Sequence, residues 1–187
     1  MIILLKNKHT IKIDDFIFKC SVGQNGISKF KIEGDLKTPR GTFQIENLYY
    51  RKDREKKPST KLKCIEIKKN MGWCDDASSH KYYNKLINTN SKLHHEKLFR
   101  KDYKYDFFIP IKYNFKKTIQ GKGSCIFIHL TNNYKPTAGC IALNKKDFMI
   151  MLKLINRKTK IKILKIRLPK IFDPIRTYVA EFSIANI

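Results

Sequence analysis

The sequence predicts one mainly β domain with minor α structure, in which a single helix follows Cys140. Three observations support this prediction. Short apolar stretches alternate with turn residues through residues 1–45, apolar and other side chains alternate again over 125–130, and an apolar stripe at helical spacing follows Asn144. A length of 187 residues fits about one domain, so we expect residues 1–187 to form a single unit.

The N-terminal region predicts a series of β-hairpins. Apolar stretches at 2–5, 11–13 and 16–22 precede the turn sequence Gly23–Gly26. A second segment rich in turn residues, 33–43, leads into a strand-like stretch at 43–50. Residues 51–63 are rich in Lys and show no apolar pattern, so we expect a mobile, exposed loop there.

The rest of the sequence predicts a long irregular segment, followed by a strand, a helix and another strand. Residues 64–106 hold the single Trp and most of the His but little periodicity. Over 125–130, Cys125, Phe127 and His129 share one face of a predicted strand. Asn144 can cap a helix over 145–156, because apolar residues recur there at helical spacing. Residues 159–166 alternate as a strand, and we expect an extended tail beyond Pro169.

The composition excludes several classes of protein. Hydrophobic residues make up 42% and aromatic residues 12% of the chain, which argues against a disordered chain, an extended coiled coil or a fibre. No apolar run approaches the roughly 20 residues that cross a bilayer, so we expect no transmembrane segment. The apolar piece after Met1 is shorter than the about 7–15 residues of a signal-peptide core, so no export signal is visible.

The net charge of +24 suggests an anionic partner. Only seven of the 40 basic residues are Arg, however, whereas proteins that bind nucleic acid depend strongly on the guanidinium fork. The lysines are also spread over the whole chain. We therefore expect a solvated basic surface and no dedicated nucleic-acid site.

The cysteines and histidines do not predict a metal site. The chain has five cysteines without CxxC spacing, and their odd number leaves at least one thiol unpaired: Cys20, Cys64, Cys74, Cys125 and Cys140. The spacing of Cys74 from His80, His94 and His95 matches no standard zinc pattern. We therefore expect neither a metal nor a cofactor.

Cys140 and His129 are the strongest candidates for chemistry. A thiol needs a nearby base to be nucleophilic at neutral pH, and an imidazole at a strand end can supply that base. Gly139 lets a substrate carbonyl approach the backbone, and the amides of Gly139 and Cys140 could stabilise an oxyanion. One Cys and one His are weak evidence alone, because a buried structural cysteine is common.

Two separated motifs make the sequence resemble the YkuD-type L,D-transpeptidase catalytic domain. The signature of that family is a His, a variable loop, then Ser or Thr, any residue, Gly and Cys, which here is His129 followed by Thr137–Cys140. The upstream element Gly-Asp-x-x-Thr-Pro-x-Gly-x-Phe is matched without a gap over 34–43. The resemblance covers about 10–166, which leaves 167–187 as a C-terminal extension.

A third stretch resembles a subgroup often found in Gram-negative bacteria. It comprises Met71–Asp76, Tyr83 and Asn84, His95 and Glu96 with Leu98 and Arg100, and then Tyr105 and Asp106. From the resemblance we expect the following residues to bind substrate: Thr137, Trp73, Asp75, Asp76, His95, Glu96 and Arg100.

Structural alternatives apply to several of these residues. A lone Trp usually packs in a core or at its rim. One of the two aspartates could pair with Arg100, and Glu96 could make a helix-start contact. The family's common Arg after the Cys is replaced by Ala142, so Arg100 or Lys135 would have to substitute for it.

The resemblance implies both a fold and a reaction. The fold would be a mixed β-sandwich or a partly closed sheet. Cys140 would attack the third residue of a peptidoglycan tetrapeptide stem, expel the terminal D-alanine and form a thioester, with Gly139 at the oxyanion. His129, oriented by a backbone carbonyl near Leu130, would move the protons. Attack by an acceptor amine would then give a cross-link.

Two alternatives remain open. The same Cys140–His129 pair with water as acceptor would give an L,D-carboxypeptidase or endopeptidase. A basic binding protein for nucleic acid or an anionic wall polymer would need neither residue. The family acts in the periplasm or cell envelope, but no signal peptide is visible, so the compartment stays open between envelope and cytoplasm.

Overall fold

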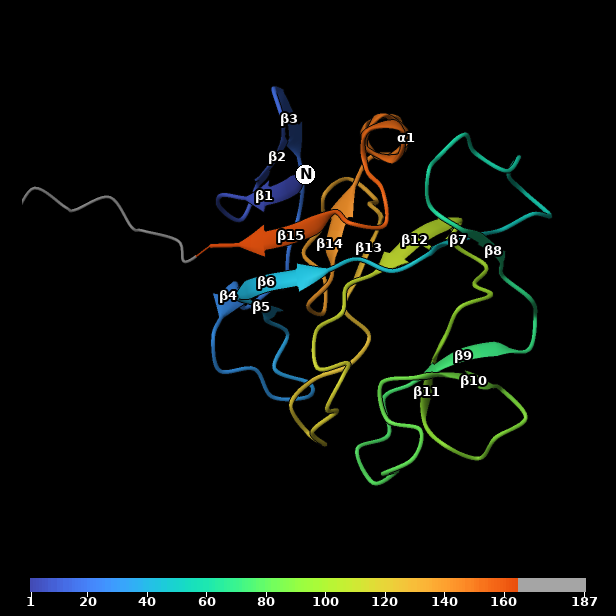
Figure 1. Ribbon diagram of the computed structural model, residues 1–187. Helices are drawn as coiled ribbons and strands as arrows, with labels where there is room; N and C mark the ends of the chain where they lie inside the picture. The colour runs from blue at the N-terminus through green and yellow to red at the C-terminus, as the bar shows by residue number, and fades with distance from the viewer. Residues whose placement is uncertain (165–187) are drawn as a thin grey trace, which may run out of the picture.

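Two five-stranded sheets face a common hydrophobic core (Figure 1). The computed structural model describes residues 1–164. The first sheet has the order β3 (Phe16–Lys19), β2 (Thr10–Ile13), β1 (Ile2–Leu5), β15 (Lys160–Ile163) and β6 (Gly41–Gln44). The second has the order β14 (Ile141–Leu143), β13 (Phe127–Leu130), β12 (Phe107–Pro110), β7 (Leu48–Tyr50) and β8 (Cys64–Glu66).

Two smaller sheets complete the fold. One has the order β10 (Leu86–Asn88), β9 (Met71–Cys74), β11 (His95–Lys97), and the other pairs β4 (Ile27–Ser28) with β5 (Thr38–Pro39). The described residues contain one helix, α1 (Lys145–Leu154), and no sheet among them closes into a barrel. The prediction of a mainly β fold with one helix after Cys140 is confirmed.

The first sheet follows the alternation in its sequence. Ile161 and Ile163 on β15 are buried, whereas Lys160 and Lys162 point outward, and the isoleucines of β2 are buried in the same way. Because side chains alternate between the two faces of a strand, this pattern fixes which face of the sheet meets the core. β15 lies parallel to β1 and antiparallel to β6, so it joins the two ends of the described chain.

The central strands of the second sheet are buried on both faces. Phe107 and Ile109 of β12 pack in the main core, while Phe108 between them packs in a second cluster with Trp73 and Tyr105. This second cluster joins the small β9–β11 sheet to the body of the domain. A strand with apolar residues at every position is typical of such two-sided burial.

Helix α1 begins and packs as the sequence predicts. The Asn144 side chain accepts a hydrogen bond from the amide of Asp147 at 2.8 Å, and Phe148, Met151 and Leu152 are buried in the main core. The helix ends at Leu154, two residues before the predicted end, because Ile155 has an extended backbone.

Two regional predictions differ from the structure, and a third is confirmed within the described residues. The stretch 43–50 is divided into β6 and β7, since residue Ile45 between them bridges to Ile111. Residues 64–106 contain four short strands, β8 to β11, instead of an irregular excursion. The predicted strand 159–166 is β15 within the described residues, while the predicted tail beyond Pro169 and the extension 167–187 lie outside them.

The Lys-rich loop is anchored at its start instead of being exposed throughout. Arg51 is 2% exposed, and its guanidinium donates to the carbonyl of Arg100 at 2.5 Å. Arg54 donates to the carbonyls of Asp102 and Lys101 and forms an ion pair with Asp106 at 3.0 Å. Arg51 and Arg54 therefore anchor the segment 100–106 to the start of the Lys-rich loop.

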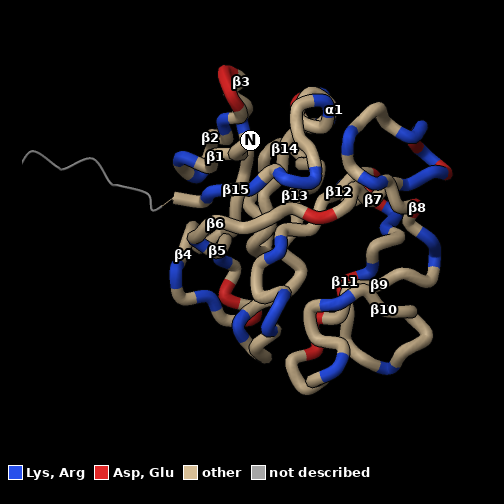
Figure 2. The backbone as a smooth tube through the Cα atoms, viewed as in Figure 1, with Lys and Arg blue, Asp and Glu red and all other residues tan. Residues whose placement is uncertain are grey.

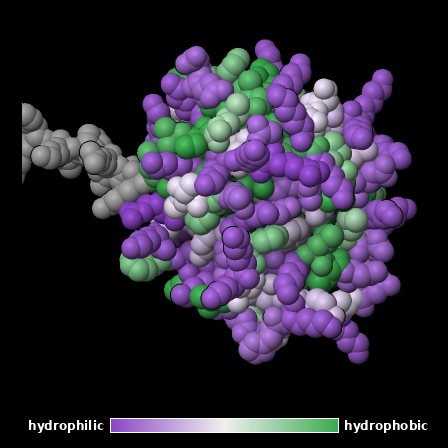
Figure 3. Space-filling model, viewed as in Figure 1, coloured by the Kyte–Doolittle hydropathy of each residue, from purple (hydrophilic) through white to green (hydrophobic). Residues whose placement is uncertain are grey.

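Basic side chains are spread over the described fold. Figure 2 shows Lys and Arg on nearly every loop and on strands of both large sheets, with no single cluster. On the face drawn in Figure 3, hydrophilic side chains cover most of the surface and the apolar patches between them are small. Among residues 1–164, α1 falls short of the length and apolar character that a membrane-spanning helix needs.

We predict that truncating the inward face of β15 strongly destabilises the fold. Ile161 is fully buried, so Ile161→Ala should lower the free energy of unfolding by about 2–5 kcal/mol through lost apolar contact and a residual cavity. Ile17 on β3 is 65% exposed, so Ile17→Ala, the matched control, should change it by less than about 0.5 kcal/mol. Urea denaturation of both variants tests this, and equal effects would contradict the assigned faces.

Candidate active site

A cleft opens where β13 ends, between β14 and the segment 96–105. It encloses about 230 Å³ and contains both residues singled out for chemistry, Cys140 and His129. The complete lining comprises Glu96, Arg100, Lys104, Tyr105, His129, Leu130, Thr131, Asn132, Lys135, Pro136, Thr137, Ala138, Cys140 and Ala142.

The pairing of β13 with β14 brings the thiol and the imidazole together. The two strands are parallel, with His129 opposite Ala142. Cys140 lies two residues before Ala142, so its side chain is on the same face as those of Ala142 and His129. Neighbouring strands are about 4.8 Å apart. Cys140, directly before β14, is therefore offset by two residues along the strand direction from the position opposite His129. The opposite face carries Ile128 and Ile141 into the main core.

A backbone carbonyl fixes the orientation of His129. Nδ1 lies 2.7 Å from the oxygen of Leu130, and because a carbonyl only accepts, Nδ1 carries the proton and Nε2 holds a lone pair. The predicted contact with Leu130 is therefore confirmed. Burial lowers the pKa of His129 to about 4, so the ring is neutral at pH 7. The Tyr105 ring packs edge-on against it at 5.3 Å.

The Cys140 thiol is held in the protein interior. Its Sγ donates to the carbonyl of Cys125 at 3.1 Å and accepts from the amide of Phe127 at 3.3 Å. Cys125, two residues before the first residue of β13, has a φ of 52°, a left-handed conformation that is rare for residues other than Gly. Burial raises the pKa of Cys140 to about 12, so the resting pair is a neutral thiol and a neutral imidazole.

Hydrogen bonds within the loop 137–140 brace the residue Cys140. The Thr137 hydroxyl donates to the carbonyl of Cys140 at 2.6 Å and accepts from the amide of Gly139 at 3.1 Å. This corrects one interpretation of the sequence: the Gly139 amide is already bonded to Thr137 and does not point toward a substrate oxyanion. The Cys140 amide is the candidate that remains.

Gly139 is required by its surroundings. Its φ is 142°, and a Cβ at this position would lie 2.9 Å from the carbonyl oxygen of Lys37. The carbonyl of Gly139 accepts from the Thr38 hydroxyl at 2.8 Å, and that hydroxyl accepts from the amide of Gly23 at 2.8 Å. Through Thr38, the upstream motif 34–43 thus stabilises the loop 137–140 that carries Cys140.

The Asp of the upstream motif organises its own loop. The Asp35 carboxylate accepts from the amides of Ile32 and Lys37 and from the ammonium of Lys31 at 2.6 Å. Burial raises the pKa of Asp35, but these hydrogen bonds and the Lys31 charge outweigh it, so the pKa is lowered overall. The conformation that presents Thr38 to Gly139 therefore depends on an ionised Asp35.

The residues that the sequence assigned to substrate binding fall into two groups. Thr137, Glu96 and Arg100 line the cleft. Trp73, in contrast, is 3% exposed in the second cluster, between Tyr49 and Phe127. The cleft does not reach its ring.

Asp75, Asp76 and His95 also lie outside the cleft. Asp75 pairs with Nδ1 of His94 at 2.5 Å, and Asp76 accepts from Ser78, so neither aspartate pairs with Arg100 as the sequence alternative suggested. His95 packs over Gly72, with Nδ1 bonded to the carbonyl of Leu93.

Glu96 does not make the helix-start contact that the sequence suggested; it forms an ion pair with Arg100. Arg100 lies 2.6 Å from Glu96 and 2.7 Å from Asp102, and its guanidinium stacks over Tyr105. Glu96 is on strand β11 and not at a helix terminus. Two carboxylates therefore offset the charge of Arg100.

Three residues around the site were given no role in it by the sequence analysis. Lys104 and Tyr105 line the cleft. Asn84 is 5% exposed, and its Oδ1 accepts from the Trp73 indole at 3.0 Å and from the Cys125 amide at 3.2 Å. It thereby links the β9–β11 sheet to the residue whose carbonyl holds the thiol. Asn84 and Tyr105 belong to the stretch that resembles the Gram-negative subgroup, whereas no motif marked Lys104.

The described residues bring together no cluster that could hold a metal ion, and the five cysteines are all free thiols.

We predict that the Thr38 hydroxyl is needed for stability. Thr38→Val keeps the shape but leaves the buried Gly23 amide and Gly139 carbonyl without a partner, which should cost about 2–4 kcal/mol. Thr42→Val, on an exposed position of β6, is the control. Urea denaturation measures both, and a Thr38→Val variant as stable as the control would contradict the bracing role.

We also predict that alkylation of Cys140 by iodoacetamide rises about tenfold per pH unit between pH 7 and 9.5. With a pKa raised to about 12, the reactive thiolate is a small fraction of the total throughout this range. Peptide mapping by mass spectrometry isolates Cys140, and protein unfolded in urea is the control. A rate already level at pH 7 would instead indicate a resting thiolate–imidazolium pair.

Comparison with known proteins places the chain in a family. The model for YkuD, the L,D-transpeptidase catalytic domain, matches residues 2–163. No curated protein matches the chain.

Two solved structures are similar to this chain. One is the helical cell shape determining protein Pgp2 from Campylobacter jejuni, with 23% identity and a TM-score of 0.47 over 90% of this chain and 50% of that one. The other is a point variant of Pgp2, with 22% identity and a TM-score of 0.44 over 97% and 53%. This chain thus spans about half the length of each. Because the family model covers most of the sequence, the chain belongs to the YkuD family of L,D-transpeptidase catalytic domains.

Proposed function

We propose that this protein is a cysteine L,D-transpeptidase acting on peptidoglycan stem peptides. Membership of the family supports a role connected with peptidoglycan. The observation that carries the specific reaction is the arrangement of Cys140 and His129: they share one face of β13–β14, line one cleft, and His129 presents an unprotonated Nε2.

The first half of the proposed reaction forms a thioester. His129 Nε2 takes the proton of Cys140 as Sγ attacks the carbonyl carbon of the third stem residue. The amide of Cys140 is the candidate donor to the oxyanion. When the tetrahedral intermediate collapses, the bond to the terminal D-alanine breaks. Its nitrogen takes the proton from His129 and leaves as the free amine.

The second half transfers the acyl group. An amine from another stem peptide attacks the thioester carbon and gives a proton to His129, which returns it to the sulfur as the thiolate leaves. The new amide is the cross-link, and both catalytic side chains regain their neutral resting states. The His129 imidazolium and the substrate oxyanion exist only while bonds are made and broken, when the substrate excludes water from the cleft.

A second candidate is hydrolysis of the same thioester, which makes the protein an L,D-carboxypeptidase. Two observations favour it. The cleft of about 230 Å³ is below the roughly 300–1,000 Å³ of typical ligand pockets, which leaves little room for an acceptor peptide beside the donor. Ala142 lines the cleft at the position where the family commonly has Arg, so that contact to a peptide is missing.

The decisive experiment is incubation with purified disaccharide-tetrapeptide followed by mass spectrometry. We predict a Cys140-dependent product, and Cys140→Ala and His129→Ala should each lower its rate at least about 10³-fold because each removes an essential group. A cross-linked dimer supports transpeptidation, and a tripeptide without dimer supports hydrolysis.

Two controls make this experiment interpretable. Cys64→Ala removes a thiol outside the cleft and should leave the rate unchanged. Circular dichroism of the two inactive variants checks that they are folded. If folded wild type gives no product that depends on Cys140, the proposed reaction is wrong.

A further inference from the structure

The loop that follows β4 buries a lysine and exposes the apolar residues on both sides of it. Phe30 is 81% exposed, more than any other large hydrophobic side chain within residues 1–164, and Ile32 is 66% exposed. Lys31 between them is only 6% exposed. This reverses the usual order, in which lysine is almost never fully buried and large apolar side chains turn inward. The inverted pattern indicates a surface that contacts an apolar partner.

The inward position of Lys31 is fixed by specific contacts. Its ammonium lies 2.6 Å from the carboxylate of Asp35 and donates to the carbonyl of Ile32 at 3.2 Å. Its stem packs against Gly123, where an added Cβ would lie 2.9 Å from the Lys31 side chain. Because this side chain is anchored inside the domain, the residues on either side of it, Phe30 and Ile32, are turned toward solvent.

A second loop places a further exposed apolar side chain, Ile119, beside the first loop. The amide of Glu33 donates to the carbonyl of Gly121 at 2.7 Å, which joins the loop 29–33 to the turn 119–122. In Figure 1 the loop that follows β4 and the gold segment before β13 both lie below β6. Figure 3 shows apolar side chains protruding at the lower left edge of the molecule, with hydrophilic side chains around them.

Side-chain hydrogen bonds hold both loops in place. The Glu33 carboxylate accepts from the hydroxyl of Ser124 at 2.7 Å and from the hydroxyl of Tyr83. The side chain of Asn114 accepts from the amide of Ile119 at 2.8 Å and donates to the carbonyl of the same residue at 2.8 Å. A surface that is already ordered loses little conformational entropy when it binds a partner. The two loops are therefore suited to docking without rearrangement.

Positive charge without acidic partners surrounds these apolar side chains. The segments 29–35 and 115–123 contain two acidic residues, Glu33 and Asp35, and both are engaged in the internal hydrogen bonds described above. The Lys29 ammonium lies 6.0 Å from the centre of the Phe30 ring. Within residues 1–164, four exposed lysines of these segments form no ion pair: Lys29, Lys116, Lys117 and Lys122. We call these four lysines, together with Phe30, Ile32 and Ile119, the loop surface.

An anionic lipid bilayer fits the loop surface better than a protein partner does. At a bilayer surface, apolar side chains enter the boundary between headgroups and acyl chains, and neighbouring lysines are attracted to anionic lipids. A second copy of this chain would bring the same lysines face to face, and lysine is depleted at protein interfaces. The β2–β3 turn also leaves an apolar side chain exposed, Ile17, but it carries Asp14 and Asp15, which such a bilayer would repel.

We propose that the loop surface docks on an anionic phospholipid bilayer, with its three apolar side chains inserted below the headgroups and its lysines against the lipid phosphates. This inference concerns where the protein binds and does not rest on the proposed function. The loop 29–33 continues into Asp35 and Thr38, and Thr38 stabilises the loop 137–140. Docking would therefore hold the cleft at a fixed distance from the lipid surface.

Co-sedimentation with vesicles tests the proposal. Wild type should bind vesicles of phosphatidylglycerol and phosphatidylcholine in equal amounts at least about tenfold more tightly than vesicles of phosphatidylcholine alone, and added salt should weaken this binding. Phe30→Gln and Ile32→Gln should each lower the partition coefficient on the mixed vesicles about tenfold, because each removes an inserted apolar side chain. Lys29→Gln and Lys122→Gln should each lower it about fivefold, because each removes one charge near the lipid surface.

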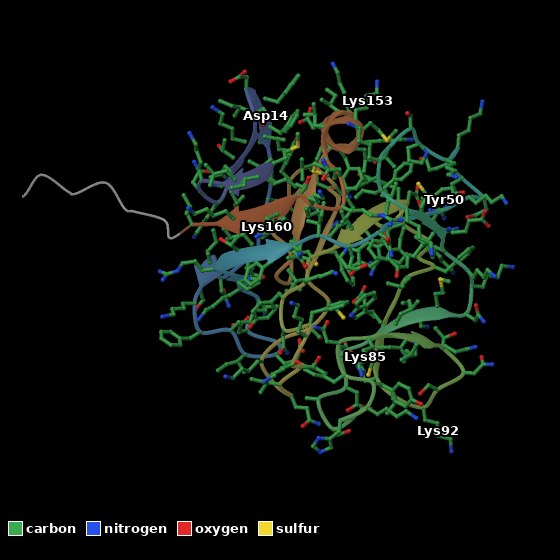
Figure 4. All side chains as sticks on the ribbon, viewed as in Figure 1. Asp14, Tyr50, Lys85, Lys92, Lys153 and Lys160 are labelled. Carbon is green, nitrogen blue, oxygen red and sulfur yellow. The ribbon has the colours of Figure 1, made fainter. Side chains whose placement is uncertain are left out.

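Matched controls separate the loop surface from the general effects of exposed apolar area and net charge. Ile17→Gln removes an apolar side chain that is 65% exposed, close to the value for Ile32. Lys153→Gln removes one exposed ammonium from α1. Figure 4 labels Lys153, and Asp14 beside β3, at the top of the view, away from the two loops. Both control variants should bind the mixed vesicles as wild type does.

Several results would overturn the proposal. Absence of binding to the mixed vesicles would do so, and so would an equal loss of binding in the control variants. If Phe30→Gln and Ile32→Gln bind as tightly as wild type, the interaction depends on net charge alone. A dimer of wild type that Phe30→Gln dissociates in sedimentation velocity, without vesicle binding, would assign the loop surface to contact between copies. Cys140→Ala should bind vesicles as wild type does, so failure of the proposed reaction would leave this result unaffected.

Discussion

The register of β13 against β14 is the constraint on which the rest of the site depends. His129 lies opposite Ala142, so Cys140 and His129 share a face while Ile128 and Ile141 fill the core behind them. A slip of one residue would exchange the two faces and put the imidazole among aliphatic side chains. The core therefore specifies the active-site geometry, because any other register would bury polar groups at large cost.

Burial sets the chemical state of this pair. A thiol hydrogen-bonded to a carbonyl and an imidazole with a pKa of about 4 stay neutral, whereas an exposed pair could exchange a proton at rest. The proposed nucleophile is thus held as a neutral thiol in the wall of the cleft. In the proposed reaction the developing negative charge on the substrate oxygen offsets the cost of the imidazolium, so the arrangement favours the transition state over the resting ion pair.

The sequence predicted best what depends on neighbouring residues. The cap at Asn144, the alternation in β13 and the contact of His129 with Leu130 follow from local pattern or from motif, and all three are confirmed. Contacts between distant segments were out of reach. The sequence alone does not distinguish a Trp73 that binds substrate from one that donates to the side-chain oxygen of Asn84. The strands within 64–106 are too short to show a recognisable alternation of apolar and polar residues. The bond from Thr38 to Gly139 spans 101 positions, so the motif revealed its residues but not their support of the cysteine loop.

The anchoring of the Lys-rich loop has a consequence for how relatives could diverge. Arg51 and Arg54 hold the carbonyls of 100–102, and the segment that follows carries Lys104 and Tyr105 into the cleft. The width of the cleft is therefore set partly by residues that no substrate touches. Changes in the length or charge of this loop offer a route by which substrate preference can drift while the Cys–His motif is kept, so conservation of the motif alone would be a poor guide to shared specificity.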